Sequence, residues 1–174
     1  MNSSWRRAAL YLEGVLFSVL VPGTVAFWLP RVVLDRPRLA IRTAWSITQF
    51  AALIPLSLGG AIYLACLWEF LTRGRGIPAP IDHPKELVVS GLYRYVRNPM
   101  YVGVLLFLLG EALFCQYLDF LVYAIVWLVL VHIAVLVYEE PNLRRKFGSS
   151  YDQYTAAVGR WIPSRRYSGP TKPY

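Results

Sequence analysis

Charged residues are scarce in this chain. Aspartate, glutamate, lysine and arginine together make up 16% of its 174 residues, whereas hydrophobic residues make up 56%. About a quarter of the residues of a soluble domain are usually charged, so this composition excludes a surface that faces only water. The surplus apolar surface needs lipid as its solvent, and the composition therefore predicts an integral membrane protein.

Cysteine and histidine are also nearly absent, with two of each. Cys66 and Cys115 both lie within apolar segments, and their spacing fits neither paired metal ligands nor an extracellular disulfide framework. We interpret both as packing residues and expect no metal ion. His83 lies in a loop, where a lone histidine is more typical of a surface residue than of an acid or a base.

Acidic residues are fewer than basic ones, 10 against 18, which gives a formal net charge of +8. A basic chain can bind nucleic acid, but these basic residues lie in short segments between apolar runs and form no polar domain of their own. We therefore expect no nucleic acid as a partner. Anionic lipid head groups explain the charge better.

The apolar residues gather in four segments that are long enough, or nearly long enough, to cross a hydrocarbon core of about 30 Å as helices. We predict an all-α integral membrane fold, one domain over residues 1–174. A cleaved signal peptide is the alternative for the first segment, but its apolar run continues too far. A tight turn near Asp119 makes the last two segments an antiparallel helical hairpin. The predicted crossings are residues 8–29, 47–71, 100–117 and 120–138.

The second of these segments contains Pro55 and the pair Gly59-Gly60. Membrane helices tolerate such residues and use them for kinks or for close contacts between helices. We therefore expect this segment to remain one helix.

The placement of lysine and arginine predicts the orientation. With the N-terminus inside, the loop 73–99 and the tail 139–174 lie on the same, cytoplasmic side. Of the basic residues, only the four arginines of the first connector, residues 30–45, then lie outside. Because basic residues favour the cytoplasmic side, we expect both termini in the cytoplasm.

Glu69 closes the second segment near the interface, and three further ionisable residues lie within the apolar segments: Glu13, Glu111 and His132. Such residues are functional hypotheses by default, because a charge in the bilayer is costly. Glu13 lies closer to the interface, and Glu111 and His132 have the alternative of pairing with each other or with the backbone. Their role stays open at this point.

The most distinctive stretch is S-G-L-Y-R-Y-V-R-N-P-M-Y-V-G, residues 90–103. Asn98 is suited to cap the helix that follows, and Pro99 is suited to its first turn. Arg97 and several tyrosines then lie at a helix N-terminus, which favours an anion. The alternative is a juxtamembrane anchor, since arginine and tyrosine are enriched at membrane interfaces.

The last apolar segment ends in Glu139-Glu140. Two carboxylates at a helix C-terminus are poorly placed for the helix dipole and need a counter-charge. Arg144, one turn later, is one candidate; the other is a cationic ligand held between the glutamates and the tyrosines of residues 90–103. The tail should then hold an amphipathic helix broken at Gly148, whose apolar residues recur at helical spacing. These are Leu143, Phe147, Tyr151, Tyr154 and Val158.

Several of these motifs, taken together, resemble one family. The segments are L-V-V-S-G-L-Y at residues 87–93, R-N-P-M-Y-V-G at 97–103, E-E-P-N-L-R-R-K-F-G-S-S-Y-D-Q-Y from Glu139, and R-W-I-P ending at Pro163. In this order they resemble the isoprenylcysteine carboxyl methyltransferase and phospholipid methyltransferase superfamily of membrane enzymes. The resemblance covers residues 85–163, about half the chain.

The resemblance implies S-adenosylmethionine as methyl donor, bound on the cytoplasmic side, and a hydrophobic methyl acceptor that enters from the bilayer. The acceptor class, an amine, a carboxylate or a thiol, stays open. Arg97, Glu139 and Glu140 are the implied catalytic residues. The implied cofactor-binding residues are Leu87, Val88, Tyr93, Arg97, Asn98, Pro99, Met100, Tyr101, Glu139 and Glu140.

This chain departs from the family pattern at two positions. Many members have histidine where this chain has Asn98, so a role for an imidazole there is lost. The prenylcysteine branch has an arginine where this chain has Val135, which argues against a prenylcysteine carboxylate as the acceptor.

Two other functions compete with this prediction. Membrane sterol reductases have a similar C-terminal region and use NADPH, but the acidic pair Glu139-Glu140 is a poor host for a phosphorylated dinucleotide. A non-enzymatic membrane module is the second alternative, in which glutamates and arginines only pair with one another across the interface.

Overall fold

The computed structural model describes residues 16, 20–34, 46–70, 72, 87–164 and 166–169. Over these residues the fold is helical, with one isolated bridge between Val96 and Gly159 and no strand. The prediction of an all-α fold is thus confirmed for the described part of the chain. The first connector from residue 35 onward, Glu13 and His83 lie outside it.

Among the described residues, two helices are long and apolar enough to cross a membrane. The first is α3 (Ile47–Glu69), which remains one helix through Pro55. The second runs for 30 residues from Leu118 to Phe147 and combines α5 (Leu118–Ala134), the π-helical segment η4 (Val135–Glu139) and α6 (Glu140–Phe147). These two helices show the hydrophobic character of a membrane protein, while the prediction of four crossings stays a prediction.

The 30-residue helix from Leu118 to Phe147, which we call the last helix because only the short α7 follows it, continues beyond Tyr138, where we expected its apolar segment to end. Pro141 lies in its path and lacks the N–H that an α-helix would bond to a carbonyl four residues earlier. The π-helical turn η4 lies directly before this proline and changes the hydrogen-bond register there. The glutamates Glu139 and Glu140 therefore lie inside a continuous helix.

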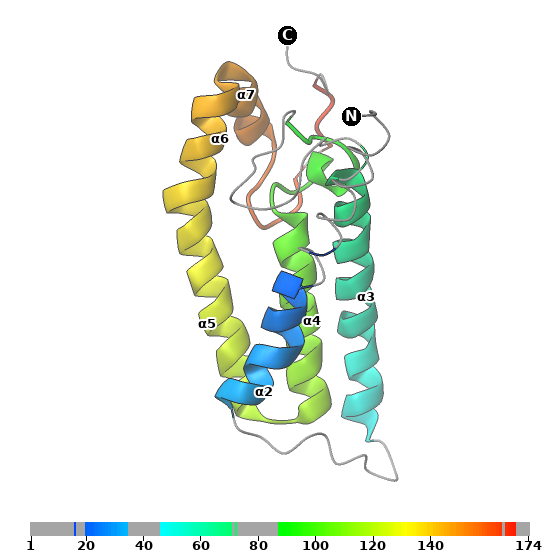
Figure 1. Ribbon diagram of the computed structural model, residues 1–174. Coiled ribbons are helices and arrows are strands. Elements are labelled where there is room, and N and C mark those ends of the chain that lie inside the picture. The colour runs from blue at the N-terminus through cyan, green and yellow to red at the C-terminus, as the bar shows by residue number, and fades with distance from the viewer. Residues whose placement is uncertain are drawn as a thin grey trace, which may run out of the picture.

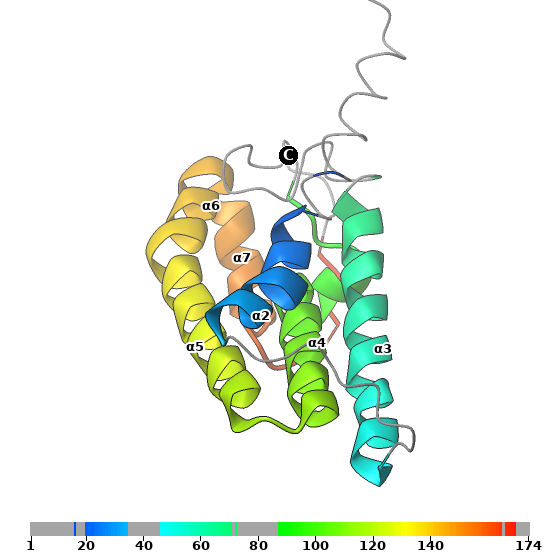
Figure 2. The ribbon, with the colours of Figure 1, turned by 60° about the horizontal axis from the view of Figure 1, so that its bottom comes forward.

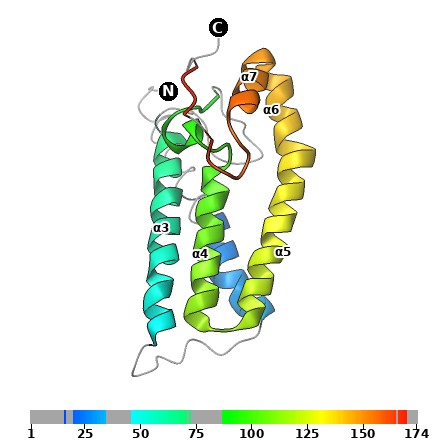
Figure 3. The same ribbon diagram turned by 180° about the vertical axis from the view of Figure 1, so that it is seen from behind.

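The shorter apolar helix α4 (Pro99–Cys115) runs antiparallel to α5, as Figures 1 and 3 show. The turn between them is at Gln116, with a φ of 57°, and Tyr117, just before Asp119, near which it was predicted. Asp119 lies in the first turn of α5, where its carboxylate suits the positive end of the helix. Gln116 also donates to Ser46 Oγ at 2.7 Å, which joins this turn to the start of α3.

Glycines bring α3 and α4 into close contact. A Cβ atom added to Gly59 would lie 2.5 Å from the carbonyl oxygen of Gly103, and one added to Gly103 would lie 2.9 Å from that of Gly59. Gly60, the other member of the pair, has open space around it. Small residues allow this approach of two backbones, which is common between membrane helices.

The N-terminal part is described without a gap over residues 20–34, and its π-helical segment η1 (Thr24–Trp28) leads into α2 (Leu29–Val33). Ala26 packs into a buried cluster with Leu108 of α4 and Ala124 of α5, and Figure 2 shows this segment in front of α4 and α5. The helical segment therefore continues past Leu29, the predicted end of the first crossing.

The polar elements gather at one end of the helices, where α3 ends and α4 begins (Figure 1). They include the 3-10 turn η3 (Gly91–Arg94), α6 and α7 (Ser149–Ala157), and Gly148, with a φ of 51°, separates α6 from α7. Two hydrophobic clusters support this end: Val89 with Tyr151, Tyr154 and Val158, and Cys66 with Val88 and Tyr93.

Candidate functional site

The segment that enters α4 is held by the tail of the protein. The Arg97 N–H donates to the Gly159 carbonyl at 2.9 Å, and the Ser164 N–H donates to the Tyr95 carbonyl at 2.8 Å. Residues 158–164, which we call the strap, therefore run alongside residues 94–98. This pairing fixes the backbone of Arg97 at the N-terminus of α4.

Asn98 and Pro99 begin α4 as predicted, but Asn98 does not cap it with its side chain. Pro99 occupies the first turn, whereas the Asn98 amide donates to the Arg160 carbonyl at 3.2 Å. The Asn98 side chain is therefore hydrogen-bonded to the strap and does not cap the helix. Asn98 connects the start of α4 to the strap.

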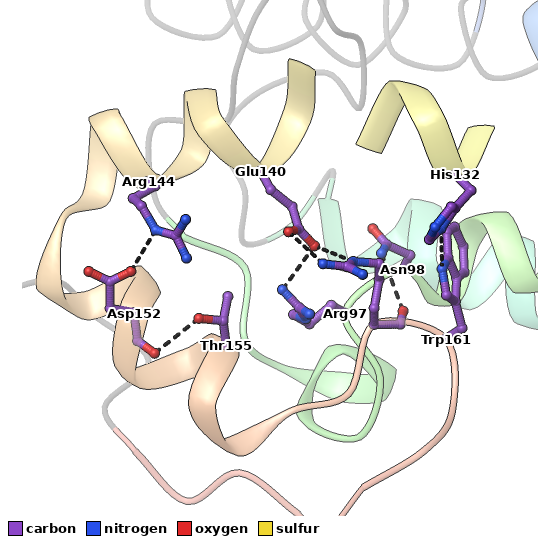
Figure 4. Close-up of polar contacts among 9 residues, drawn as sticks. Arg97, Asn98, His132, Glu140, Arg144, Asp152, Thr155 and Trp161 are labelled. Carbon is purple, nitrogen blue, oxygen red and sulfur yellow. Dashed lines mark hydrogen bonds and ion pairs between the residues drawn. The ribbon is translucent and has the colours of Figure 1, made fainter. Parts of the chain in front are cut away.

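Glu140 lies between two arginines from distant parts of the chain (Figure 4). Arg97 Nη1 is 2.9 Å from Glu140 Oε1, while Arg160 donates to both carboxylate oxygens, at 2.6 Å and 2.9 Å. The side chains of Arg97 and Glu140 are only 13% and 12% exposed. The hydrogen bond to Glu140 raises the pKa of the Arg160 guanidinium.

Glu139 has a different partner. It accepts a hydrogen bond from the Tyr101 hydroxyl, which links the last helix to the first turns of α4. The ring of Tyr101 lies 6.2 Å from that of Trp127 and 6.5 Å from that of Trp161, between ring centroids. A carboxylate and three aromatic rings therefore meet beside the Glu140 cluster.

Arg144 is not the main counter-charge of the acidic pair, contrary to the simpler alternative. Its Nε lies 2.7 Å from Asp152 Oδ1, and both side chains are exposed. The break at Gly148 turns α7 so that Asp152 comes to Arg144 (Figure 4). The charges that balance Glu140 come instead from Arg97 and Arg160.

The remaining candidate residues pack beside this site. Tyr93 is buried, and burial raises the pKa of its hydroxyl well above the ordinary value. Val88 and Met100 pack in the cluster of Tyr93, and Leu87 packs against the cluster of Tyr151 and Tyr154. Tyr93, Val88, Met100 and Leu87 thus make packing contacts. The polar contacts join Arg97 to Glu140 and Tyr101 to Glu139.

Tyr154 fastens α7 to the same end of the molecule. Its buried hydroxyl donates to the Tyr93 carbonyl at 2.6 Å. Burial raises the pKa of this hydroxyl, so it remains a hydrogen-bond donor at ordinary pH. The bond holds the 3-10 turn η3 against α7.

Sequence reasoning missed the residues that the strap contributes. Arg160 and Trp161 belong to the R-W-I-P motif, but no role followed from it. Trp161 Nε1 donates to His132 Nδ1 at 2.9 Å (Figure 4). The alternative that His132 pairs with Glu111 is therefore wrong. Trp161 and His132 lie near Tyr101 at the start of α4, whereas Glu111 is buried about three turns further along that helix.

The donor set of the site suits a small molecule with charges of both signs. The Glu139 carboxylate and the aromatic faces favour a cation, whereas Arg97 favours an anion. Arg97 Nε is buried and has no hydrogen-bond partner within the described part of the chain. No group of three metal-binding side chains occurs in the same described part.

Comparison with known proteins identifies the family of the chain. The phospholipid methyltransferase family model matches residues 47–150. The chain belongs to this family.

Two curated relatives carry related names. Over 150 residues, 85% of its length, the chain is 30% identical to the protein-S-isoprenylcysteine O-methyltransferase of Schizosaccharomyces pombe. Over 129 residues, 71% of its length, it is 27% identical to protein-S-isoprenylcysteine O-methyltransferase B of Arabidopsis thaliana. The aligned part is 63% and 62% of these relatives, so the chain spans about three fifths of their length. No solved structure matches the chain.

Proposed function

We propose that this protein transfers a methyl group from S-adenosylmethionine to a lipid or another hydrophobic acceptor at the cytoplasmic face of a membrane. The observation that carries the proposal is the convergence of Arg97 and Tyr101 with Glu139 and Glu140 at one end of apolar helices. Membership in the phospholipid methyltransferase family supports the same reaction class.

The residues present fit S-adenosylmethionine. Its sulfonium and ammonium groups suit the carboxylates and the faces of Tyr101 and the neighbouring tryptophans. Its carboxylate suits Arg97, whose buried Nε offers a donor that no described residue uses. As the resemblance implies, Leu87 and Val88 would supply backbone contacts. The residues that would help Arg97 and Tyr101 to hold the cofactor are Tyr93, Asn98, Pro99 and Met100.

When bound, S-adenosylmethionine would supply a methyl group on a positively charged sulfur, which leaves as the neutral thioether of S-adenosylhomocysteine. The protein's own contribution is positioning and exclusion of water, which together lower such a barrier by several kcal/mol. If the acceptor is an amine, it must also lose a proton, and Glu139, Glu140 or water can take it. A carboxylate acceptor needs no such step.

The proposed orientation places the site in the cytoplasm. We propose four crossings in one membrane domain over residues 1–174, with both termini on the cytoplasmic side, because the basic residues favour that side. In this arrangement the strap, α6 and α7 lie against the cytoplasmic membrane surface. An acceptor dissolved in the bilayer then approaches the site along the helices.

The acceptor is proposed only by class. The curated relatives are named for isoprenylcysteine, but Val135 stands where that branch has an arginine, and Val135 is 1% exposed. A buried valine offers no charge to a carboxylate. A phospholipid amine is therefore as well supported as a prenylated carboxylate.

Thermal unfolding of the purified protein in detergent tests the proposal. S-Adenosylhomocysteine should raise the unfolding temperature with its concentration, and NADPH should not, because only a ligand of the folded state stabilises it. Arg97→Ala should abolish the shift. Arg144→Ala removes an arginine that lies outside the site and should keep it. A shift with NADPH alone would favour the sterol reductase alternative, and no shift with either would favour the non-enzymatic one.

A further inference from the structure

Trp161 of the strap reaches the space between α4 and the last helix. Its ring centroid lies 5.9 Å from that of His132 and 6.5 Å from that of Tyr101. The Tyr101 hydroxyl is bonded to Glu139. The indole of Trp161 therefore lies between His132 and the Tyr101 end of the candidate site. Figure 4 shows the rings of Trp161 and His132 side by side.

His132 lies on the side of the last helix that faces the protein interior. Val135, one turn later, is 1% exposed, and residues three apart share one face of a helix. His132 is seven residues before Glu139, which corresponds to about 10 Å along the helix. This histidine therefore lies deeper along the membrane helix than the carboxylates, on the side of the bilayer from which an acceptor would come.

The hydrogen bond to Trp161 fixes which ring nitrogen of His132 carries hydrogen. An indole N–H can only donate, so His132 Nδ1 must be the acceptor and the ring hydrogen lies on Nε2. Within the part of the chain that the structure describes, Nε2 has no hydrogen-bond partner. His132 is partly exposed, so a bound molecule can reach its Nε2 hydrogen with an oxygen.

We propose that His132 determines acceptor specificity by donating its Nε2 hydrogen to an oxygen of the hydrophobic acceptor, and that Trp161 is the positioning residue that orients the ring. This inference rests on the proposed function. The chemistry recognised is an anionic oxygen close to the methylated atom. A phosphodiester of a phospholipid and the carboxylate of a prenylated cysteine both supply such an oxygen.

Two substitutions of His132 separate recognition from structure. His132→Asn places an amide oxygen near the position of Nδ1, so it keeps an acceptor for Trp161 but loses the outward donor. His132→Gln places an amide nitrogen near the position of Nε2, so it keeps the outward donor but loses the acceptor for Trp161. A residue that only holds Trp161 in place would tolerate the first change and not the second.

The experiment measures methyl transfer to two probes, dioleoylphosphatidylethanolamine in mixed micelles and N-acetyl-S-farnesylcysteine, together with the affinity for S-adenosylhomocysteine. We expect His132→Asn to raise the KM of the acceptor about tenfold, the effect of one lost hydrogen bond, with kcat and S-adenosylhomocysteine affinity unchanged. We expect His132→Gln, which keeps the donor but loses the bond that orients it, to raise this KM by less than His132→Asn does. The probe whose KM responds identifies the source of the oxygen.

The reverse order, with His132→Gln impaired and His132→Asn normal, would overturn the inference and leave a structural role. Equal effects of both variants, or loss of S-adenosylhomocysteine binding in both, would overturn it as well. A wild-type protein that binds S-adenosylhomocysteine but methylates neither probe also overturns it. Only a wild-type protein without such binding would overturn the proposed function itself.

Discussion

Arg160 binds Glu140 through both carboxylate oxygens, at 2.6 Å and 2.9 Å, although the two residues belong to the strap and to the end of the last helix. Arg97, from the start of α4, shares the same carboxylate. One glutamate thus holds together the three segments that surround the candidate site.

Arg160→Ala should destabilise the protein by about 1 kcal/mol, because it removes a two-point charged hydrogen bond from a carboxylate that is largely shielded from water. Arg160→Lys should recover only part of the loss, since lysine cannot form the two-point contact. The measurement is the thermal unfolding temperature in detergent. Arg144→Ala, which breaks an exposed ion pair, is the control and should cost about 0.5 kcal/mol or less. Equal effects of the alanine variants would contradict the account.

Gly59→Ala should destabilise the protein by about 1–3 kcal/mol, because the new Cβ would lie 2.5 Å from the Gly103 carbonyl oxygen and force α3 and α4 apart. Gly60→Ala is the matched control. Its Cβ meets open space, so this substitution should leave stability unchanged or raise it slightly. Unfolding temperatures of the two variants give the comparison, and similar values would show that the close packing is not what holds the helices.

Tyr101→Phe should lower methyl transfer about tenfold while leaving the fold intact, because it removes only the hydroxyl that orients Glu139. Tyr123→Phe is the control, since the Tyr123 hydroxyl donates to the Val25 carbonyl at 2.8 Å, away from the site. Initial rates with radiolabelled S-adenosylmethionine and circular dichroism of both variants are the measurements. If the control loses as much activity as Tyr101→Phe, the Glu139 contact has no special role.

The proposed orientation can be tested with single cysteines in a Cys66→Ser, Cys115→Ala background. Lys146→Cys in α6 should react with an impermeant maleimide only from the cytoplasmic side, and Thr48→Cys at the start of α3 only from the opposite side. Both positions are exposed in the structure. Sealed vesicles of the two orientations separate the results. Labelling of both positions from one side would refute the topology.

The sequence predicted the features that depend on composition and local pattern. The long apolar helix α3, the break at Gly148 and Pro99 in the first turn of α4 all follow from residues close together in the chain. The meeting of the acidic pair with Arg97 and Tyr101 was expected from their shared side of the membrane and from the resemblance. The structure brings these residues into contact.

The features that depend on distant contacts were not predictable in the same way. Asn98 has the residue type of a helix cap, yet its amide bonds to the strap because Arg160 lies beside it in the fold. Arg144 is one turn from Glu140, yet the turn at Gly148 gives it Asp152. Local spacing ranks candidate partners, but it does not report which distant segment comes close.

The central claim is that the acidic pair and Arg97 bind the methyl donor rather than only pairing with each other. Isothermal titration of S-adenosylhomocysteine into the wild type and Glu139→Gln tests it most directly, because glutamine keeps an oxygen for the Tyr101 hydroxyl but removes the charge. The account predicts saturable binding by the wild type, and at least about tenfold weaker binding by the variant at an unchanged unfolding temperature. Equal affinities, or no binding by the wild type, would contradict it.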